Sequence, residues 1–348
     1  MAKLGLGAAM ATTLIPGLDD DAAYQCLLRV TLPSHGQMRQ VSRAWRNLVS
    51  SAKFYDDRSA QGLDEEWLVA TVMLRQETLI MAFNPNSAKK AWMILPPPPQ
   101  HIHGIAGFEC KALGGKLYLL GGWRGKKLVS VFDSHTNRWS AAAPMLCPRA
   151  HCASAAMEGR LYVVGGNLMG KGLDAEVYDP VEDRWEPLPQ SPSPETIAFH
   201  IAIVVDRTKM AVFSRGGVGA TLVFSARDLS WEVADTGLPG RRCFVHSNRI
   251  YEADMAGSLM WRYERGKNMW EALRLTNASS SDDRFFFRTV SCQKNIWAVS
   301  MNCKVVTVIQ VPSDGGLEAK VVAVYKLSVP FSDDPLVLRT FDVDILRA

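Results

Sequence analysis

The sequence is poor in the features that mark membrane, secreted and nucleic-acid-binding proteins. No stretch reaches the ~18 consecutive apolar residues of a membrane span, and the Gly/Ala-rich start has too short an apolar run for a signal peptide. The seven cysteines are irregularly spaced, lack a C-x-x-C pair and predict no disulfide framework. The net charge of +4 is too diffuse to favour nucleic acid. We therefore expect a disordered leader, residues 1–13, and a cytoplasmic or nuclear location, with no membrane or nucleic-acid partner.

Signals for chemistry are equally sparse. Cys147, His151 and Cys152 lie close together, but the regularly spaced ligands of a metal site are missing. The run Arg215-Gly-Gly-Val-Gly219 lacks the Lys-Ser/Thr that completes a phosphate-binding loop. The sequence therefore predicts no metal, no cofactor and no catalytic residues.

The strongest positive signal is an internal repeat. Tryptophans recur at intervals of roughly 45 residues, the period of a propeller blade, at Trp92, Trp139, Trp185, Trp231 and Trp270. In the last four copies a tyrosine or phenylalanine stands seven positions earlier, as in Phe132 and Tyr178, with polar turn residues between. This pattern predicts a hairpin whose first strand ends at the aromatic residue and whose second strand begins at the tryptophan.

A second strand precedes each hairpin and ends in a glycine pair. Residues 115–122 (GKLYLLGG) align with residues 159–166 (GRLYVVGG), and later copies are more degenerate. About four short strands in roughly 45 residues are typical of a propeller blade, which buries its faces by stacking against its neighbours. Paired glycines suit a crowded position at the contact between blades.

We predict a mainly β protein whose residues 67–348 form about six blades. The first blade lacks an obvious innermost strand before Trp67. The alternating tail, residues 336–345, is predicted to supply that strand and close the ring. These repeats resemble the kelch repeat, in which a glycine pair ends the second strand and an aromatic residue and a tryptophan follow on the third and fourth. The resemblance implies a kelch-type β-propeller.

Residues 14–51 are helical in pattern. Asp19 or Asp20 is a natural N-cap, apolar residues follow at helical spacing, and Pro33 is expected to end the first helix. A second apolar stripe runs through residues 41–49. So short a segment buries little surface and needs a partner, and we expect residues 52–66 to be a helical linker to the propeller.

This segment resembles the F-box domain. The resemblance lies in Leu14-x-Pro16, in Leu27-Leu28 with Val30, and in Val41-Ser42-x-x-Trp45-Arg46. In that family such residues dock on the Skp-type adaptor of cullin ubiquitin ligases. The resemblance assigns this role to Leu14, Pro16, Leu18, Leu27 and Leu28, whereas Val41, Trp45 and Leu48 are expected to pack three helices together.

An F-box ahead of kelch blades looks like the large plant family of F-box/kelch-repeat proteins. It implies a non-catalytic substrate-recognition subunit of an SCF-type ubiquitin ligase, which binds the adaptor, and through it cullin, with one domain and an unknown target protein with the other. A kelch scaffold without a role in degradation and a propeller enzyme remain as alternatives.

The target is expected on one rim of the propeller, where loops vary freely. The candidate rim residues are one aromatic and eight cations: Trp123, Arg124, Lys126, Lys127, Arg149, Lys171, Arg215, Arg241 and Arg242. A basic rim favours an acidic stretch of the target. The alternatives are that these cations are merely solvated, or that Arg149 braces its own blade.

Overall fold

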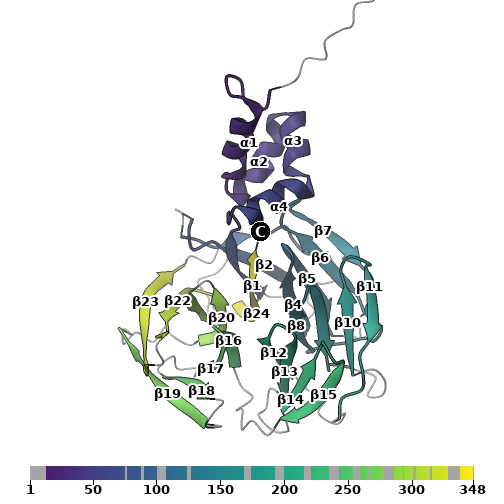
Figure 1. Cartoon of the computed structure of the whole chain (residues 1–348), viewed down its shortest axis with the longest axis vertical. Coiled ribbons are helices and arrows are strands. Elements are labelled where there is room, and N and C mark those ends of the chain that lie inside the picture. Colours follow the sequence, from purple (N-terminus) through teal and green to yellow (C-terminus); the bar gives the residue numbers. More distant parts are fainter. Residues whose placement is uncertain are drawn as a thin grey trace, which may run out of the picture. The chain divides into compact units, whose positions relative to one another are not determined.

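The protein is described here by a computed structural model (Figure 1). The structure describes residues 13–74, 77–87, 90–99, 107–123, 127–167, 174–192, 200–214, 221–234, 243–253, 259–264, 267, 269–277, 286–292, 294–300, 303–313, 316–327 and 338–347. The predicted leader lies outside these residues except for Thr13. The chain forms a helical unit that ends at Glu65 and a β unit that begins at Glu66. Among the described helices, none has the length and apolarity required to cross a bilayer.

The helical unit contains four α-helices and one short 3-10 helix: α1 Asp20–Leu28, η1 Leu32–Ser34, α2 His35–Val41, α3 Arg43–Val49 and α4 Ala52–Ala60. The predicted N-cap is confirmed, because the Asp19 carboxylate accepts a hydrogen bond of 2.8 Å from the Ala22 amide. The end predicted for the first helix is wrong. α1 ends before Pro33, which instead lies in the first turn of η1, where its missing N–H costs nothing.

The apolar core of the helical unit draws on α1, α2, α3 and α4, through Leu27, Leu28, Met38, Val49, Phe54 and Tyr55. The fully buried Arg58 of α4 donates hydrogen bonds to the carbonyl oxygens of Leu28, Val30 and Leu63. Residues 52–66, predicted to be a helical linker, contain the helix α4, whose Phe54 and Tyr55 lie in the core of this unit. The sequence did not reveal this because Phe54 and Tyr55 are adjacent and show no helical repeat.

The β unit consists of six four-stranded blades within the described residues, as predicted. The first blade consists of β24 Leu338–Arg347, β1 Glu66–Leu74, β2 Glu77–Phe83 and β3 Met93–Ile94. The second consists of β4 Phe108–Leu113, β5 Lys116–Gly121, β6 Val129–Asp133 and β7 Arg138–Ala142. The third consists of β8 Ala153–Met157, β9 Arg160–Val164, β10 Ala175–Asp179 and β11 Arg184–Pro187. The fourth blade consists of β12 His200–Asp206, β13 Lys209–Ser214, β14 Thr221–Ser225 and β15 Ser230–Ala234. The fifth consists of β16 Cys243–His246, β17 Arg249–Ala253, β18 Leu259–Glu264 and β19 Met269–Thr276. The sixth consists of β20 Phe286–Cys292, β21 Asn295–Ser300, β22 Val305–Gln310 and β23 Glu318–Lys326.

The last strand closes the ring, as the alternating tail predicted. β24 pairs antiparallel with β1, with Leu68 opposite Ile345 and Ala70 opposite Val343. The innermost strands β4, β8, β12, β16, β20 and β24 each contact the next, and β24 contacts β4. The first and last strands of the β unit therefore share one blade, and each of the described blades contacts a neighbour on both sides.

The fifth and sixth blades, unlike the other four, are joined to each other by strand pairing. The outer strand β19 pairs parallel with the start of β23, with Arg274 opposite Glu318 and Thr276 opposite Lys320. The two blades consequently form one sheet of eight strands.

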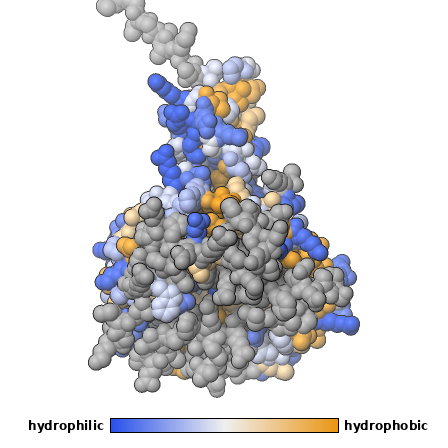
Figure 2. Space-filling model, turned by 180° about the vertical axis from the view of Figure 1, so that it is seen from behind, coloured by the Kyte–Doolittle hydropathy of each residue, from blue (hydrophilic) through white to orange (hydrophobic). Residues whose placement is uncertain are grey.

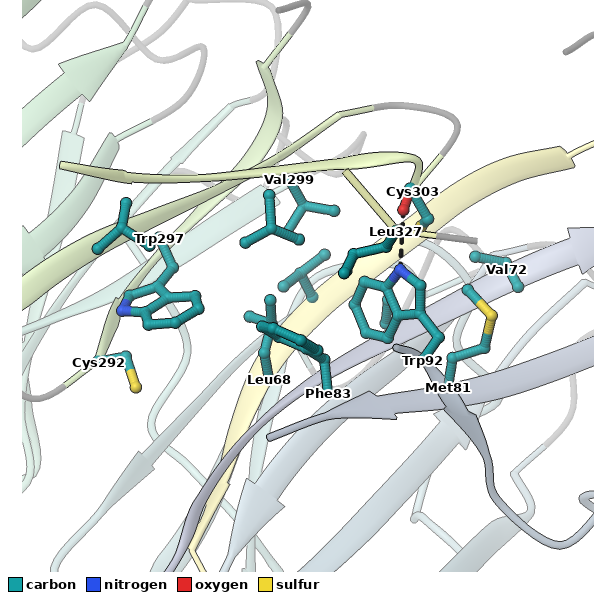
Figure 3. Packing of buried hydrophobic residues seen from close by; sticks show 14 residues of the cluster. Leu68, Val72, Met81, Phe83, Trp92, Cys292, Trp297, Val299, Cys303 and Leu327 are labelled. Atoms are coloured by element: carbon teal, nitrogen blue, oxygen red, sulfur yellow. Dashed lines mark hydrogen bonds between the residues drawn. The ribbon is translucent and has the colours of Figure 1, made fainter. Parts of the chain in front are cut away.

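The core of the β unit lies between blades, where flat side chains fill the space. The predicted hairpin partners face each other across the strands, with Phe132 opposite Trp139 and Tyr178 opposite Trp185. At the boundary of the first and sixth blades, Figure 3 shows Phe83 and Trp92 packed with residues of the sixth blade such as Trp297. The Trp92 indole N–H donates a hydrogen bond of 2.8 Å to the Cys303 carbonyl across this boundary.

Candidate protein-interaction sites

The start of the helical unit presents apolar residues to solvent. Leu18 is 42% exposed, Pro16 is exposed and Leu14 is half-buried. Gly17 has a left-handed φ of 88°, which turns the chain between Pro16 and Leu18. The segment is fixed at its beginning, because the Leu14 carbonyl accepts a hydrogen bond of 2.6 Å from the Trp45 indole and its amide donates one of 3.0 Å to Asp20. These residues thus form an exposed apolar edge held in one conformation.

Two of the residues assigned to adaptor docking lie elsewhere. Leu27 and Leu28 are 2% and 0% exposed and lie in the core of the helical unit, so they cannot belong to a docking face of this fold. Both side chains pack in one cluster with apolar residues of the other helices, among them Phe54 and Tyr55 of α4. Apolar spacing in the sequence marks a helix face but does not say whether that face meets the protein's own core or a partner.

Val41 was expected inside and is instead 61% exposed. The apolar stripe of residues 41–49 is broken at Ser42, whose hydroxyl caps α3 by accepting a hydrogen bond of 3.1 Å from the Trp45 amide. Val41 therefore ends α2, whereas Trp45 and Leu48 pack against the core as predicted. Figure 2 shows apolar and strongly polar residues both present on the visible face of the helical unit.

Two titratable groups of the helical unit, His35 and Tyr24, have pKa values that are shifted mainly by burial. Burial lowers the pKa of His35 to about 4. The hydrogen bond to the Val30 carbonyl opposes this, and the nearby Arg58 and Arg39 guanidinium groups add a smaller lowering. Burial and a 2.6 Å hydrogen bond to Asp57 raise the pKa of Tyr24 to about 12. Both side chains are therefore neutral at pH 7 and serve as packing and hydrogen-bonding groups.

The structure describes three of the nine predicted rim residues. Trp123 is 47% exposed and Lys127 is exposed, in agreement with an accessible rim. The other six lie outside the described residues: Arg124, Lys126, Lys171, Arg215, Arg241 and Arg242.

Arg149 is not a rim residue. Its side chain is 0% exposed, and its Nε lies 2.6 Å from Oε1 of Glu176, which is equally buried. Its Nη1 donates hydrogen bonds of 2.6 Å to the Gly165 carbonyl and 3.1 Å to the Asp174 carbonyl. Since Glu176 is on β10 of the same blade, Arg149 braces its own blade, and a target cannot reach it. The guanidinium group suits this position because its several donors satisfy the carboxylate and both carbonyl groups.

The glycine pairs lie next to the residues around the buried Arg149–Glu176 pair. This agrees with their predicted place at a crowded contact between blades. A side chain at Gly121 would collide with the Arg149 carbonyl, and one at Gly166 would lie 2.5 Å from the Ala150 carbonyl. The Gly122 amide donates a hydrogen bond of 2.8 Å to the Arg149 carbonyl, which joins the second blade to the third.

A cavity of about 440 Å³ runs between the inner strands of the β unit. Its charged residues pair with their neighbours: Lys111 Nζ lies 3.3 Å from Asp344 Oδ2, and Ser154 Oγ donates a hydrogen bond of 3.1 Å to Glu109. These contacts link β4 to β24 on one side and to β8 on the other. Sequence reasoning missed them because the partners lie on different blades, far apart in the sequence.

Two family models match the chain. The F-box domain model matches residues 15–57, which include most of the helical unit. The Kelch motif model matches residues 105–146 and 148–192, which form the second and third blades.

The curated relatives come from Arabidopsis thaliana. The chain is 29% identical to F-box/kelch-repeat protein At1g16250 over 70% of this chain and 67% of that protein. It is 31% identical to F-box protein AFR over 49% of this chain, and the match spans about half of that protein, 48%. It is 27% identical to F-box/kelch-repeat protein SKIP4 over 85% of this chain and 84% of that protein.

Among solved structures, one titled "Structure of YjhT" matches with a TM-score of 0.51, covering 74% of this chain and 97% of that chain at 13% identity. So low an identity is evidence for the fold alone.

A helical F-box unit followed by a propeller with kelch motifs defines a class of two-part adaptor proteins. The chain is similar to the F-box/kelch-repeat proteins of plants, as its resemblance predicted. An F-box match precedes the kelch matches, and two of the Arabidopsis relatives above are F-box/kelch-repeat proteins. At the level of the family, this combination supports a role as an SCF substrate adaptor, in which the F-box implies binding to a Skp-type adaptor and the propeller implies binding to a target protein.

Proposed function

We propose that this protein is the substrate receptor of an SCF-type ubiquitin ligase and marks one target protein, or a small set, for ubiquitination and proteasomal degradation. The helical unit binds a Skp-type adaptor and thereby cullin, and the propeller binds the target. The receptor catalyses nothing itself. By holding target and ligase in one complex it raises the effective concentration of the target's lysines at the site of ubiquitin transfer.

The observation that carries the proposal is the exposed apolar edge of the helical unit. Leu18, 42% exposed, follows the exposed Pro16, in the stretch that the F-box match covers. An exposed apolar edge on a small, otherwise complete helical core supports a protein partner rather than a purely structural role. Val41, 61% exposed, is a second candidate contact on the same unit.

We expect the protein to act in the cytoplasm or the nucleus. None of the seven cysteines forms a disulfide, and five of them, Cys110, Cys152, Cys243, Cys292 and Cys303, are buried in the β unit. Burial raises the pKa of the Cys152 thiol, which keeps it protonated and unreactive. Thiols persist without forming disulfides in a reducing compartment.

The test is co-expression of the full chain with a Skp-type adaptor, followed by purification and affinity measurement. Leu18→Asp places a charge on the docking edge and should weaken adaptor binding by at least about tenfold. The matched control is Val181→Asp, because Val181 is 93% exposed on a hairpin turn of the propeller. Both variants should melt at the wild-type temperature.

Failure of the wild-type chain to bind any Skp-type adaptor would refute the proposal and favour a scaffold without a role in degradation. With the proteasome blocked, proteins that remain bound to Leu18→Asp while the adaptor is lost are the target candidates.

A further inference from the structure

The cavity inside the ring of blades has the size of a small-molecule site. Its volume is about 440 Å³, and such sites span roughly 300–1,000 Å³. Its described wall comes from the six inner strands β4, β8, β12, β16, β20 and β24. Solvent reaches this wall, because the Lys111 and Asp344 side chains are 22% and 20% exposed. We call this space the central cavity.

The wall of the central cavity is formed by strand edges. Neighbouring residues of a strand point to opposite faces of its sheet, yet consecutive residues line the cavity, as at 201–204 on β12 and 288–291 on β20. Each inner strand is hydrogen-bonded to one other strand, so its second edge is turned toward the cavity. Such an edge presents backbone N–H and C=O groups in a row.

The Ala112 amide shows how these edges bind polar groups. It lies on β4 and donates a hydrogen bond of 2.8 Å to Oδ2 of Asp344, a side chain of the neighbouring inner strand β24. Backbone edges offer donors and acceptors alike. A ligand that both donates and accepts hydrogen bonds therefore suits this wall.

The two sides of the central cavity differ in polarity. The inner strands follow one another around the ring in the order β4, β8, β12, β16, β20 and β24, so that β12 lies opposite β24 and β16 lies opposite β4. The lining residues of β12 and β16, 201–204 and 243–245, are aliphatic, aromatic or cysteine. The opposite side carries the charged residues Glu109, Lys111 and Asp344. This arrangement suits a molecule with an apolar body and polar groups along one edge.

The charges on the described wall balance, since the acids Glu109 and Asp344 are matched by the bases Lys111 and Arg288. Lys111 Nζ lies 3.3 Å from Asp344 Oδ2, and Glu109 accepts a hydrogen bond of 3.1 Å from Ser154 Oγ. A charged ligand loses its hydration on entering such a cavity and meets both signs of charge there, so its desolvation is poorly compensated. The balance therefore favours a ligand without net charge.

We propose that the central cavity binds a small amphipathic molecule without net charge, in which an apolar ring or chain carries amide or hydroxyl groups. The apolar part packs on β12 and β16, and the polar groups form hydrogen bonds with the strand edges and with the polar side chains of β4 and β24. The propeller thus has a small-molecule site in addition to the target surface of the proposed function. The sequence predicted no cofactor, because the residues of this site are spread over six strands.

The test uses three probes that share an indole ring and differ in charge: the neutral N-acetyltryptophanamide, the anion N-acetyltryptophan and the cation tryptophanamide. Their dissociation constants for the full chain are measured by saturation-transfer NMR at about pH 6, where an α-amino group is protonated. We expect the neutral probe to bind at least about threefold more tightly than either charged probe.

Large side chains on two different strands should block the site. Ala112→Phe on β4 and Thr289→Phe on β20 enlarge half-buried lining residues, and each should weaken binding of the neutral probe by about tenfold or more, because the new ring occupies the cavity. The control is Ala272→Phe, the same change at an exposed residue of the outer strand β19, which should leave binding unchanged. The melting temperature of each variant checks that it folds.

Charge changes should alter which probe is preferred. Lys111→Met leaves an excess of acid on the wall and should shift the preference several-fold toward tryptophanamide, whereas Asp344→Asn should shift it several-fold toward N-acetyltryptophan. Lys320→Met removes an exposed charge of β23 and is the control that should cause no shift. These variants test the site even if a phenylalanine variant does not fold.

Four results would overturn the proposal: no saturable binding of any probe, a wild-type preference for a charged probe, unchanged binding in a folded Ala112→Phe or Thr289→Phe chain, or an unchanged preference in Lys111→Met and Asp344→Asn. None of these results bears on adaptor binding. The ligase role therefore stands or fails separately.

Discussion

The Trp185 indole N–H donates a hydrogen bond of 2.8 Å to the Ala143 carbonyl, which lies in the connector leaving the preceding blade. The same bond recurs one blade earlier, from Trp139 to Pro96, and one blade later, from Trp231 to Pro189. The repeated tryptophan therefore does more than fill space between blades. It gives the connector carbonyl a partner where the chain passes from one blade to the next, which accounts for its regular recurrence in the sequence.

Replacing Trp185 by phenylalanine should keep the packing of a flat ring and remove the donor. Trp185 is 5% exposed, so the Ala143 carbonyl loses its partner at a site that is largely shielded from water. We expect the free energy of unfolding to fall by about 1–3 kcal/mol, the cost of an unsatisfied buried polar group. Urea denaturation followed by circular dichroism measures it. Trp231→Phe is the control, since its hydrogen bond is solvent-exposed and water can replace the donor. An equal loss in both variants would contradict the explanation.

Removing one partner of the buried pair should destabilise the third blade severely. Arg149→Met leaves the Glu176 carboxylate buried without its counter-ion, for which we expect a loss of about 3–5 kcal/mol. The double variant Arg149→Met/Glu176→Leu should lose less than the sum of the two single changes, because no charge remains buried. As the control, Arg184→Met breaks the exposed pairs with Glu182 and Glu186 and should change stability by less than about 0.5–1 kcal/mol. Additive losses at Arg149 and Glu176 would show that the pair is not coupled.

The helical unit should become less stable in mild acid because of His35. The folded unit lowers the pKa of His35 from 6.5 to about 4, so the unfolded chain takes up a proton at a higher pH than the folded chain. The stability that neutral His35 provides is thus complete above pH 6.5 and is lost as the pH falls toward 4, by at most on the order of 3 kcal/mol.

Hydrogen exchange of residues 20–60, corrected for the intrinsic rate at each pH, measures this loss in the full chain. His35→Gln keeps a neutral polar side chain at all pH values and should flatten the dependence between pH 6.5 and 4. A slope that is the same in wild type and variant would assign the effect to other groups.

Features that depend on residues close together in the sequence could be predicted, whereas features that depend on contacts between distant residues could not. The hairpins follow from residues seven apart, such as Tyr178 and Trp185, and the closing strand follows from alternation in a single segment. The burial of Arg149 depends on Glu176, 27 residues away on another strand, so the sequence left open whether Arg149 lies on the rim or braces its own blade. Leu28 shows the same limit. An apolar residue on a short helix suits a core and a docking face equally, and only the packing of α4 decides between them.

Ring closure by β24 provides the most direct test of the fold. Deleting residues 338–348 removes the strand that pairs with β1 and that contacts β4 and β20, and it leaves β1 as an open edge. We expect the truncated chain to aggregate, because an open apolar strand edge pairs with other chains.

A milder change on the same strand is Val343→Ala. Val343 is 7% exposed within the cluster shared by the first and sixth blades, and its loss should cost about 1–3 kcal/mol. Arg347→Ala, which removes only a pair with Glu66 in which the arginine side chain is 72% exposed, is the control and should melt within a few degrees of wild type. A truncated chain that stays monomeric and melts cooperatively at the wild-type temperature would show that the other five blades close the ring without β24.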